Sequence, residues 1–163
     1  MPSPPNSSAI ANSLIGVLLA DPQLAALMPD GVYYDVARAG AKRFVIVSFV
    51  DGVDIATYDG RAIESALYLV KAVALASTGG NVEAAAERID ALLEDQFWTI
   101  APGLELMTCF RSGNVLRTTE PDSTNPELYW NHRGGRYRLD VALTPYRTLG
   151  RLTGNEQNGR VTP

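Results

Sequence analysis

Apolar residues recur at helical spacing in two parts of the chain. The first part predicts a helix over residues 7–20, capped by Asn6 or Ser7. Its apolar face consists of Ile10, Leu14, Val17 and Leu18. Asp21-Pro22 then predicts a cap followed by proline in the first position of a short helix, which Gly31 ends. The second part predicts a helix over residues 81–94, with an apolar face of Val82, Ala86, Ile89 and Leu93.

Shorter apolar runs predict β-strands at residues 32–36, 44–50, 62–74, 104–110 and 136–143. Alanines leave a helix possible at residues 62–74, and Gly113-Asn114 favours a hairpin that returns at residues 115–118. Residues 51–60 carry turn signals at both ends and are expected to form a loop. The run 44–50 is apolar on both faces apart from Ser48. That pattern is typical of a strand covered by helices on one side and by another layer, such as a second subunit, on the other.

The order helix, strands, helix, strands predicts an α+β fold. We expect an antiparallel or mixed sheet of about four to five strands, with two main helices packed on one face. A length of 163 residues, 46% of them hydrophobic and 20% charged, fits one domain with a core. We place this domain at residues 1–143, including a proline-rich N-terminal arm at residues 1–8. Residues 144–163 are expected to form a polar C-terminal arm.

Charge and cysteine content narrow the function classes. The net charge of −4 gives no general attraction to phosphate backbones. Residues 1–95 hold 12 acidic and 6 basic side chains, whereas residues 96–163 hold 6 acidic and 8 basic, so the chain can be electrically complementary to a copy of itself. Cys109 is the only cysteine, which excludes an internal disulfide. Because neither a signal-peptide pattern nor an apolar run of ~20 residues occurs, we expect folding in a reducing cytoplasm and no membrane partner.

Motifs for catalysis, cofactors or metals are scarce. His132 is the only histidine, and no nucleophile elbow, phosphate loop or zinc-protease helix occurs, so we expect no enzyme activity, cofactor or metal site. Thr78-Gly79-Gly80-Asn81 precedes a helix but lacks the lysine and repeated glycines of phosphate loops, which favours a plain turn. Three acids do not have the spacing of a calcium loop and are interpreted as solvated turn residues: Asp51, Asp54 and Asp59.

Four acidic residues of the second predicted helix lie on one stripe at i, i+4, i+7 and i+11: Glu83, Glu87, Asp90 and Glu94. Like-charge neighbours destabilise an isolated helix by ~0.2–0.5 kcal/mol each. A solvated surface explains the stripe, because such costs are small and screened by salt. The functional alternatives are the lining of a lumen or an interface with arginines of an adjacent subunit or partner. The candidate arginines are Arg133, Arg136 and Arg138.

The segment from Tyr129 to Arg138 mixes aromatic and basic residues. Such a mixture is typical of surfaces that bind single-stranded nucleic acid. A hairpin whose turn is Gly134-Gly135 explains the pattern equally well. Because the whole protein is acidic, nucleic-acid binding is the less favoured interpretation. A small nucleic-acid-binding module that uses this hairpin stays as the alternative from a different functional class.

The segments between residues 14 and 143 follow one layout. A leading helix runs into Gly31-Val32-Tyr33, and the strand Phe44-Val45-Ile46-Val47 follows. A long strand at residues 67–73, a helix ending in Leu92-Leu93 and a last strand entered through Gly135-Arg136-Tyr137 complete it. This layout resembles that of phage tail-completion proteins, in particular the tail-terminator and tail-to-head joining proteins of long-tailed phages. The chain departs from their pattern in its longer tail after Thr144 and at Arg43, where a proline is common.

The resemblance implies a structural virion protein, made in the cytoplasm of a host bacterium. Such subunits form a ring, commonly hexameric, that caps the tail tube, stops its polymerisation and joins the tail to neck or head-completion proteins. Genome DNA would pass through without sequence-specific binding, and an acidic lining would let it slide. The acid stripe and a lumen loop of Asp51, Asp54 and Asp59 are the candidates for that lining. A head-completion or neck ring subunit is the runner-up.

Overall fold

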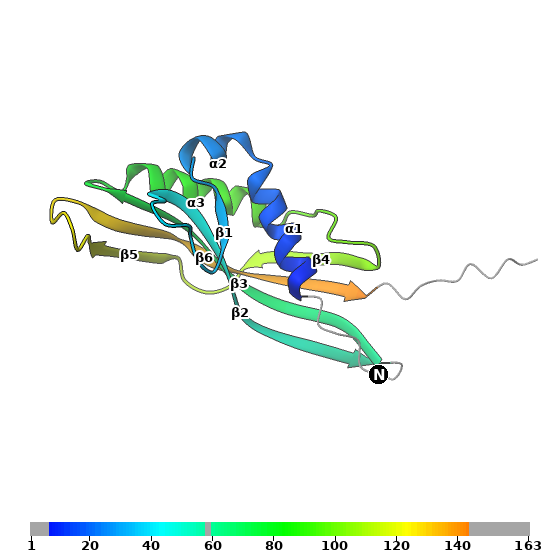
Figure 1. Cartoon of the computed structure of the whole chain (residues 1–163). Coiled ribbons are helices and arrows are strands. Elements are labelled where there is room, and N and C mark those ends of the chain that lie inside the picture. Colours follow the sequence, from blue (N-terminus) through cyan, green and yellow to red (C-terminus); the bar gives the residue numbers. More distant parts are fainter. Residues whose placement is uncertain (1–6, 58–59, 144–163) are drawn as a thin grey trace, which may run out of the picture.

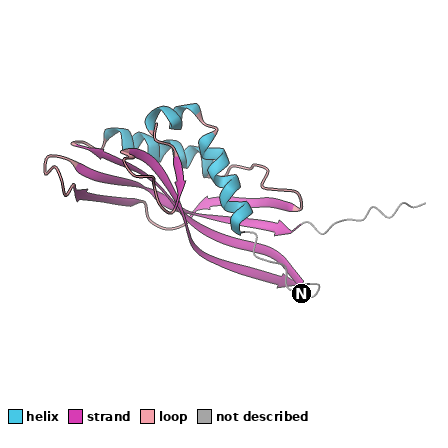
Figure 2. Ribbon diagram, in the orientation of Figure 1, coloured by secondary structure: helices cyan, strands magenta, loops and turns pink. Residues whose placement is uncertain are grey.

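The computed structural model describes residues 7–57 and 60–143, which contain three helices and six strands. The helices are α1 (Ser7–Leu19), α2 (Pro22–Leu27) and α3 (Gly80–Leu93). The strands are β1 (Val32–Tyr34), β2 (Arg43–Thr57), β3 (Gly60–Ala76), β4 (Leu104–Arg111), β5 (Leu116–Pro121) and β6 (Tyr129–Leu143). The three helices lie on one face of a twisted sheet, and β2 and β3 form a long hairpin (Figures 1 and 2). The predicted α+β class is confirmed, with one strand more than expected and a short third helix.

The sheet is mixed, in the order β1-β2-β3-β6-β4. β1 runs parallel to β2, and every other pair is antiparallel. Because β3 lies along one whole edge of β6, β4 and β5 share the other edge end to end. β4 pairs with residues 137–143 of β6, and β5 pairs with residues 129–134.

The register divides the sheet into two halves. In the half that contains the β2–β3 tip, the outermost strands are β4 and β2. Rows of residues cross this half from β4 through β6 and β3 to β2, for example Thr108, Asp140, Ser65 and Val53. In the other half, β5 takes the place of β4, and β1 flanks β2. A row there consists of Thr118, His132, Val73 and Phe44.

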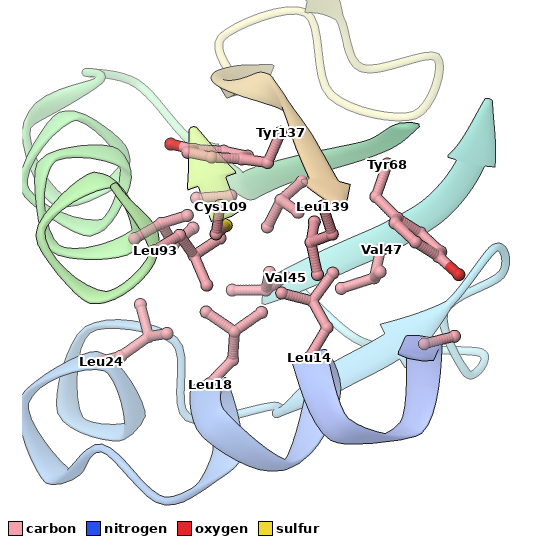
Figure 3. Close-up of a cluster of buried hydrophobic side chains, with 14 of the residues drawn as sticks. Leu14, Leu18, Leu24, Val45, Val47, Tyr68, Leu93, Cys109, Tyr137 and Leu139 are labelled. Carbon is pink, nitrogen blue, oxygen red and sulfur yellow. The ribbon is translucent and has the colours of Figure 1, made fainter. Parts of the chain in front are cut away.

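Apolar side chains fill the space between the helices and the sheet (Figure 3). The helices contribute Leu14, Leu18, Leu24 and Leu93, and the strands contribute Val45, Val47, Tyr68 and Leu139. All of these are fully or almost fully buried. Since burial of one such aliphatic side chain contributes ~1.5–3 kcal/mol, this packing fixes the helices on the sheet.

None of the described helices lies over the second face of the sheet. At the end near β1, a smaller cluster of Ala41, Phe44 and Val73 is covered by Tyr33 and Trp130. The rings of Phe44 and Trp130 lie 6.2 Å apart. β2 is thus apolar on both faces here, as predicted. At this end, the cover on the second face of β2 comes from the same chain, and not from a second subunit, which the sequence had left possible.

Several predicted elements are confirmed to within a few residues. α1 and α3 match the predicted helices, and β1, β3 and β4 match predicted strands. Asp21 caps α2, since its carboxylate accepts a hydrogen bond from the Leu24 N–H at 2.7 Å, and Pro22 follows it. β3 is a strand, which settles the alternative of a helix at residues 62–74.

Two predictions near turn signals are wrong. The loop expected at residues 51–60 is largely strand, because β2 continues to Thr57 through irregularities beside Phe49 and Ile55. These β-bulges accommodate the turn-forming residues without ending the pairing. The hairpin expected at Gly113-Asn114 is absent from the described residues, because β5 pairs with β6 and not with β4.

The turn expected at Gly134-Gly135 is also wrong, since β6 runs straight through both residues. Gly134 lies so close to β3 that a Cβ atom there would come within 2.1 Å of the Val70 carbonyl oxygen. A glycine in a strand interior often marks such a close approach of another backbone. Gly134 therefore reflects close packing of β6 on β3, whereas a Cβ atom at Gly135 would meet the Arg111 side chain of β4.

Candidate assembly interface

Glu83, at the start of the acidic stripe on α3, is paired with arginines of its own chain. Arg133 lies on β6 beneath the helix with its side chain 10% exposed, and its Nε donates to Glu83 Oε1 at 2.6 Å. The Arg133 Nη1 group also donates to the backbone carbonyls of Thr118 and His132. Arg117 on β5 donates to the second oxygen of Glu83 at 3.1 Å. Arg133 is thus used within the chain and is a poor candidate for pairing with another subunit.

Asp90 and Glu94 are bound in the same way. Asp90 Oδ1 accepts hydrogen bonds from Arg111 Nη1 and from the Tyr137 hydroxyl, both at 2.9 Å. Glu94 Oε2 accepts the Arg111 backbone N–H at 2.5 Å. Burial, together with the hydrogen bond to Asp90, raises the pKa of Tyr137. These contacts tie α3 to β4 and β6, which explains how a helix with a like-charge stripe remains stable. A role of the stripe in contacting another subunit stays a prediction.

The other candidate residues lie on two opposite faces of the molecule. Glu87 is exposed on α3 and has no hydrogen bond or ion pair among the residues that the structure describes. Arg136 and Arg138 alternate with buried Tyr137 and therefore face the helix-free side of the sheet. Arg138 donates to Ser65 Oγ at 3.0 Å, whereas Arg136 is exposed. The stripe could meet these two arginines only across two copies of the chain.

The sequence did not assign a partner to Arg88, and the structure supplies one. Its guanidinium holds both carboxylate oxygens of Asp21, with Nη2–Oδ2 at 2.5 Å and Nε–Oδ1 at 3.1 Å. The hydrogen bond from Arg88 lowers the pKa of Asp21. The sequence offered one indirect indication of this contact. No acidic residue lies three or four positions from Arg88 on its own helix, so any ion pair of Arg88 had to be with another element. The pair fastens α3 to the start of α2.

The proposed lumen acids are not gathered in one loop. Asp51 and Asp54 lie within β2 and are exposed, while Asp59 lies outside the described residues. Asp51 pairs with Leu67 and Asp54 with Glu64, so the two acids face opposite sides of the hairpin. Across residues 7–57 and 60–143, no group of three potential ligands is arranged to hold a metal ion.

The segment from Tyr129 to Arg138 does not form one nucleic-acid-binding surface. Arg133 and Tyr137 point toward the helices and are buried, whereas Trp130 and Arg136 lie on the other face. The Trp130 indole N–H donates to Asp122 at 3.0 Å. The hairpin interpretation of this segment is wrong, because β6 is one continuous strand. The cations and rings are divided between its two faces, so they do not share the single surface that the nucleic-acid alternative assumed.

Exposed apolar side chains gather at two opposite edges of the sheet, a feature that the sequence interpretation missed. The first group, which we call the β2 edge, consists of Tyr34, Val36, Phe49, Val50, Val53 and Ile55. The second group, the β4 edge, lies on β4 and the segments that lead into and out of it, and consists of Phe97, Met107, Phe110 and Val115. Of the large apolar side chains that are exposed in the described chain, only Leu19 and Tyr129 lie elsewhere.

None of the described helices is long and apolar enough to cross a membrane. A search of curated proteins finds no match to the chain. Among solved structures, a chain described as "Virion of native gene transfer agent (GTA) particle" superposes with a TM-score of 0.67 at 19% sequence identity. The match covers 86% of this chain and 99% of that one, and at this identity it shows a shared fold.

A comparison with protein families gives the identity. The family described as "Tail completion protein gp17" matches residues 12–126. This match covers more than half of the 163 residues and agrees with the resemblance found in the sequence. The chain therefore belongs to the tail completion protein gp17 family.

Proposed function

We propose that this protein forms a ring at the head-proximal end of a phage tail, where it ends polymerisation of the tail tube and joins the tail to head or neck proteins. The observation that carries the proposal is the family match over residues 12–126. A place in the virion is in keeping with the gene transfer agent particle, whose component has the same fold.

The shape of the subunit supports assembly into a ring. A closed ring uses one contact, repeated head to tail, between two different surfaces of each subunit. The β2 edge and the β4 edge are two such surfaces, on opposite sides of one sheet. Ring closure would cover both edges, which in an isolated subunit leave apolar side chains in water.

We further propose that the protein acts without catalysis. Burial raises the pKa of the Cys109 thiol to about 12, so a thiolate nucleophile is strongly disfavoured near neutral pH. Among residues 7–57 and 60–143, neither buried ring nitrogen of His132 has a hydrogen-bond partner, so no hydroxyl or carboxylate of that part of the chain is positioned to act with the only histidine. The ion pairs of Glu83, Asp90 and Asp21 connect helices to the sheet or to each other, which is a structural use of charge.

Genome DNA would pass through the ring without sequence-specific contacts. The net charge of −4 and the division of basic residues between two faces favour sliding over binding. The proposed partners are further copies of the chain, the tail tube protein and neck or head-completion proteins.

The test is light-scattering mass together with negative-stain images of the purified full chain, alone and mixed with tail tubes. We expect rings, commonly of six copies, seated on one end of each tube. Rings that bind head vertices and ignore tubes would move the protein to the neck. A subunit that stays solitary with tubes and heads both present would contradict the proposal.

A further inference from the structure

The β2 edge is an outer strand over most of its length. β1 pairs with β2 only at residues 45–47. Beyond them, residues 48–57 pair with β3 on their inner side, and no described strand pairs with their outer side. Soluble proteins protect outer strands with bulges and charges, and β2 has both. Even so, Phe49, Val50, Val53 and Ile55 are 42–53% exposed on this short stretch. An apolar surface of this kind marks a place where another protein binds.

The β4 edge is the outer strand on the opposite side of the same half of the sheet. Part of its backbone is already hydrogen-bonded within the chain, since the Asp95 N–H donates to the Cys109 carbonyl at 2.9 Å. The Arg111 N–H likewise donates to Glu94. A neighbour would therefore meet this edge mainly through side chains, of which Met107 is 46% and Phe110 37% exposed.

The two edges lie at the same level of the sheet. The row through Phe110, Arg138 and Leu67 ends at Asp51 on β2, and the row through Thr108 ends at Val53. A rotation about an axis roughly parallel to the strands would thus bring the β2 edge of one copy beside the β4 edge of the next, with little shift along that axis. Repetition of this operation gives a closed ring and not a helical filament.

One cation near the β4 edge can meet acids of the β2 edge. Asp35 and Asp51 are exposed along the β2 edge, and residues 34–36 and 48–56 contain no lysine or arginine. On the other side, Arg136 lies one strand in from β4, is exposed, and has no ion pair within the described ranges. Two exposed acids, Glu105 on β4 and Asp95 beside it, also lie at the β4 edge, so the apolar side chains and not the charges carry most of the contact.

We propose that neighbouring subunits bind head to tail, with the β2 edge of one copy against the β4 edge of the next. This inference rests on the proposed ring and names the surfaces that build it. The contact is made mainly by apolar side chains from Val53 and Ile55 on one copy and Met107 and Phe110 on the other.

Two double variants test the inference, one for each edge. The β2-edge variant is Val53→Asp with Ile55→Asp, and the β4-edge variant is Met107→Asp with Phe110→Asp. Leu19→Asp is the control, because Leu19 is 55% exposed but lies on α1 and belongs to neither edge. Circular dichroism and thermal melting verify that each variant folds. Light-scattering mass is then measured at the concentration where the wild type forms rings, with tail tubes added if the rings need them.

We expect rings from the wild type and Leu19→Asp, and single subunits from each double variant alone. In an equal mixture, the intact β4 edge of one variant binds the intact β2 edge of the other. The product is therefore a dimer that cannot grow, with twice the mass of one 17.6 kDa chain. A β4-edge variant that dimerises by itself would show that β2 edges pair with each other, and would overturn the inference. A mixture that stays monomeric would overturn it as well.

A second measurement does not depend on disrupting the contact. Val53→Cys and Thr108→Cys chains, mixed, should be joined by a short bismaleimide, because the two positions end the same row of the sheet and would face each other across the proposed contact. Either chain alone should not be joined, and Thr118→Cys, on β5 in the other half of the sheet, is the matched control. Rings that form normally without any such cross-link would end this inference and leave the proposed function intact. A wild type that never forms rings would end both.

Discussion

The ion pair between α3 and β6 gives a quantitative test of how the acidic stripe is used. Glu83→Gln removes the charge that Arg133 and Arg117 share but keeps the size of the side chain. Arg133 then keeps its two backbone carbonyl partners, but at position 83 it meets a neutral amide oxygen in place of a carboxylate. Because its side chain is only 10% exposed, water can replace the lost carboxylate only in part.

The expected loss in free energy of unfolding depends on how far the paired side chains are exposed to solvent. A hydrogen bond to a charged group contributes ~1.5–3 kcal/mol, and we reduce this to ~1–2 kcal/mol because the Glu83 side chain is 37% exposed and partly screened by solvent. The Arg117 side chain is 66% exposed, so its coupling to Glu83 should be only ~0.2–0.5 kcal/mol. The loss of free energy of unfolding should therefore be larger for the Arg133 contact than for the Arg117 contact.

The assay is urea unfolding of Glu83→Gln, Arg133→Met, Arg117→Met and the two double variants, read as double-mutant cycles. Glu87→Gln is the control, since Glu87 lies on the same stripe but is exposed, and its substitution should change stability by less than ~0.5 kcal/mol. Equal couplings of Glu83 to the two arginines, or no loss in Glu83→Gln, would refute the conclusion that the stripe is held by its own chain.

Further predictions concern backbone packing and pH. Gly134→Ala should lower the free energy of unfolding, measured in urea, by more than ~2 kcal/mol, because its Cβ would lie 2.1 Å from the Val70 oxygen. Gly16→Ala, at an open position of α1, should raise that free energy by ~0.5–1 kcal/mol. A Gly134→Ala variant as stable as the wild type would contradict the close approach of the two strands. Burial, together with the charge of Lys71, lowers the pKa of His132 below its ordinary value of 6.5, so the unfolded chain takes up this proton first as pH falls. Stability should therefore decrease from about pH 7.5 to about pH 5.5 in thermal melts, and His132→Gln should remove that slope.

The helices were predictable because their apolar repeats alone decide which face is buried. Leu14, Leu18, Ile89 and Leu93 are all in the core, as their spacing indicates. Asp21 was predictable as a cap for a similar reason, since the hydrogen bond to the Leu24 N–H joins residues three apart.

Long-range pairing overrode local turn preferences in the sheet. Gly134-Gly135 and the acidic segment after Val50 are typical of turns, yet both lie within long strands. Nothing in the local sequence shows that β3 passes within van der Waals contact of Gly134. The partner of Glu83 was missed as an intrachain contact because Arg133 is fifty residues away. The two apolar edges could be recognised only once the strand order was known.

The proposal that this family member completes a phage tail is tested most directly by electron microscopy of lysates from its phage with the gene disabled, and again after the intact gene is supplied. We predict tail tubes longer than normal and without heads in the first lysate, and normal tails joined to heads in the second. Tails of normal length, attached to heads in the absence of this protein, would contradict the account.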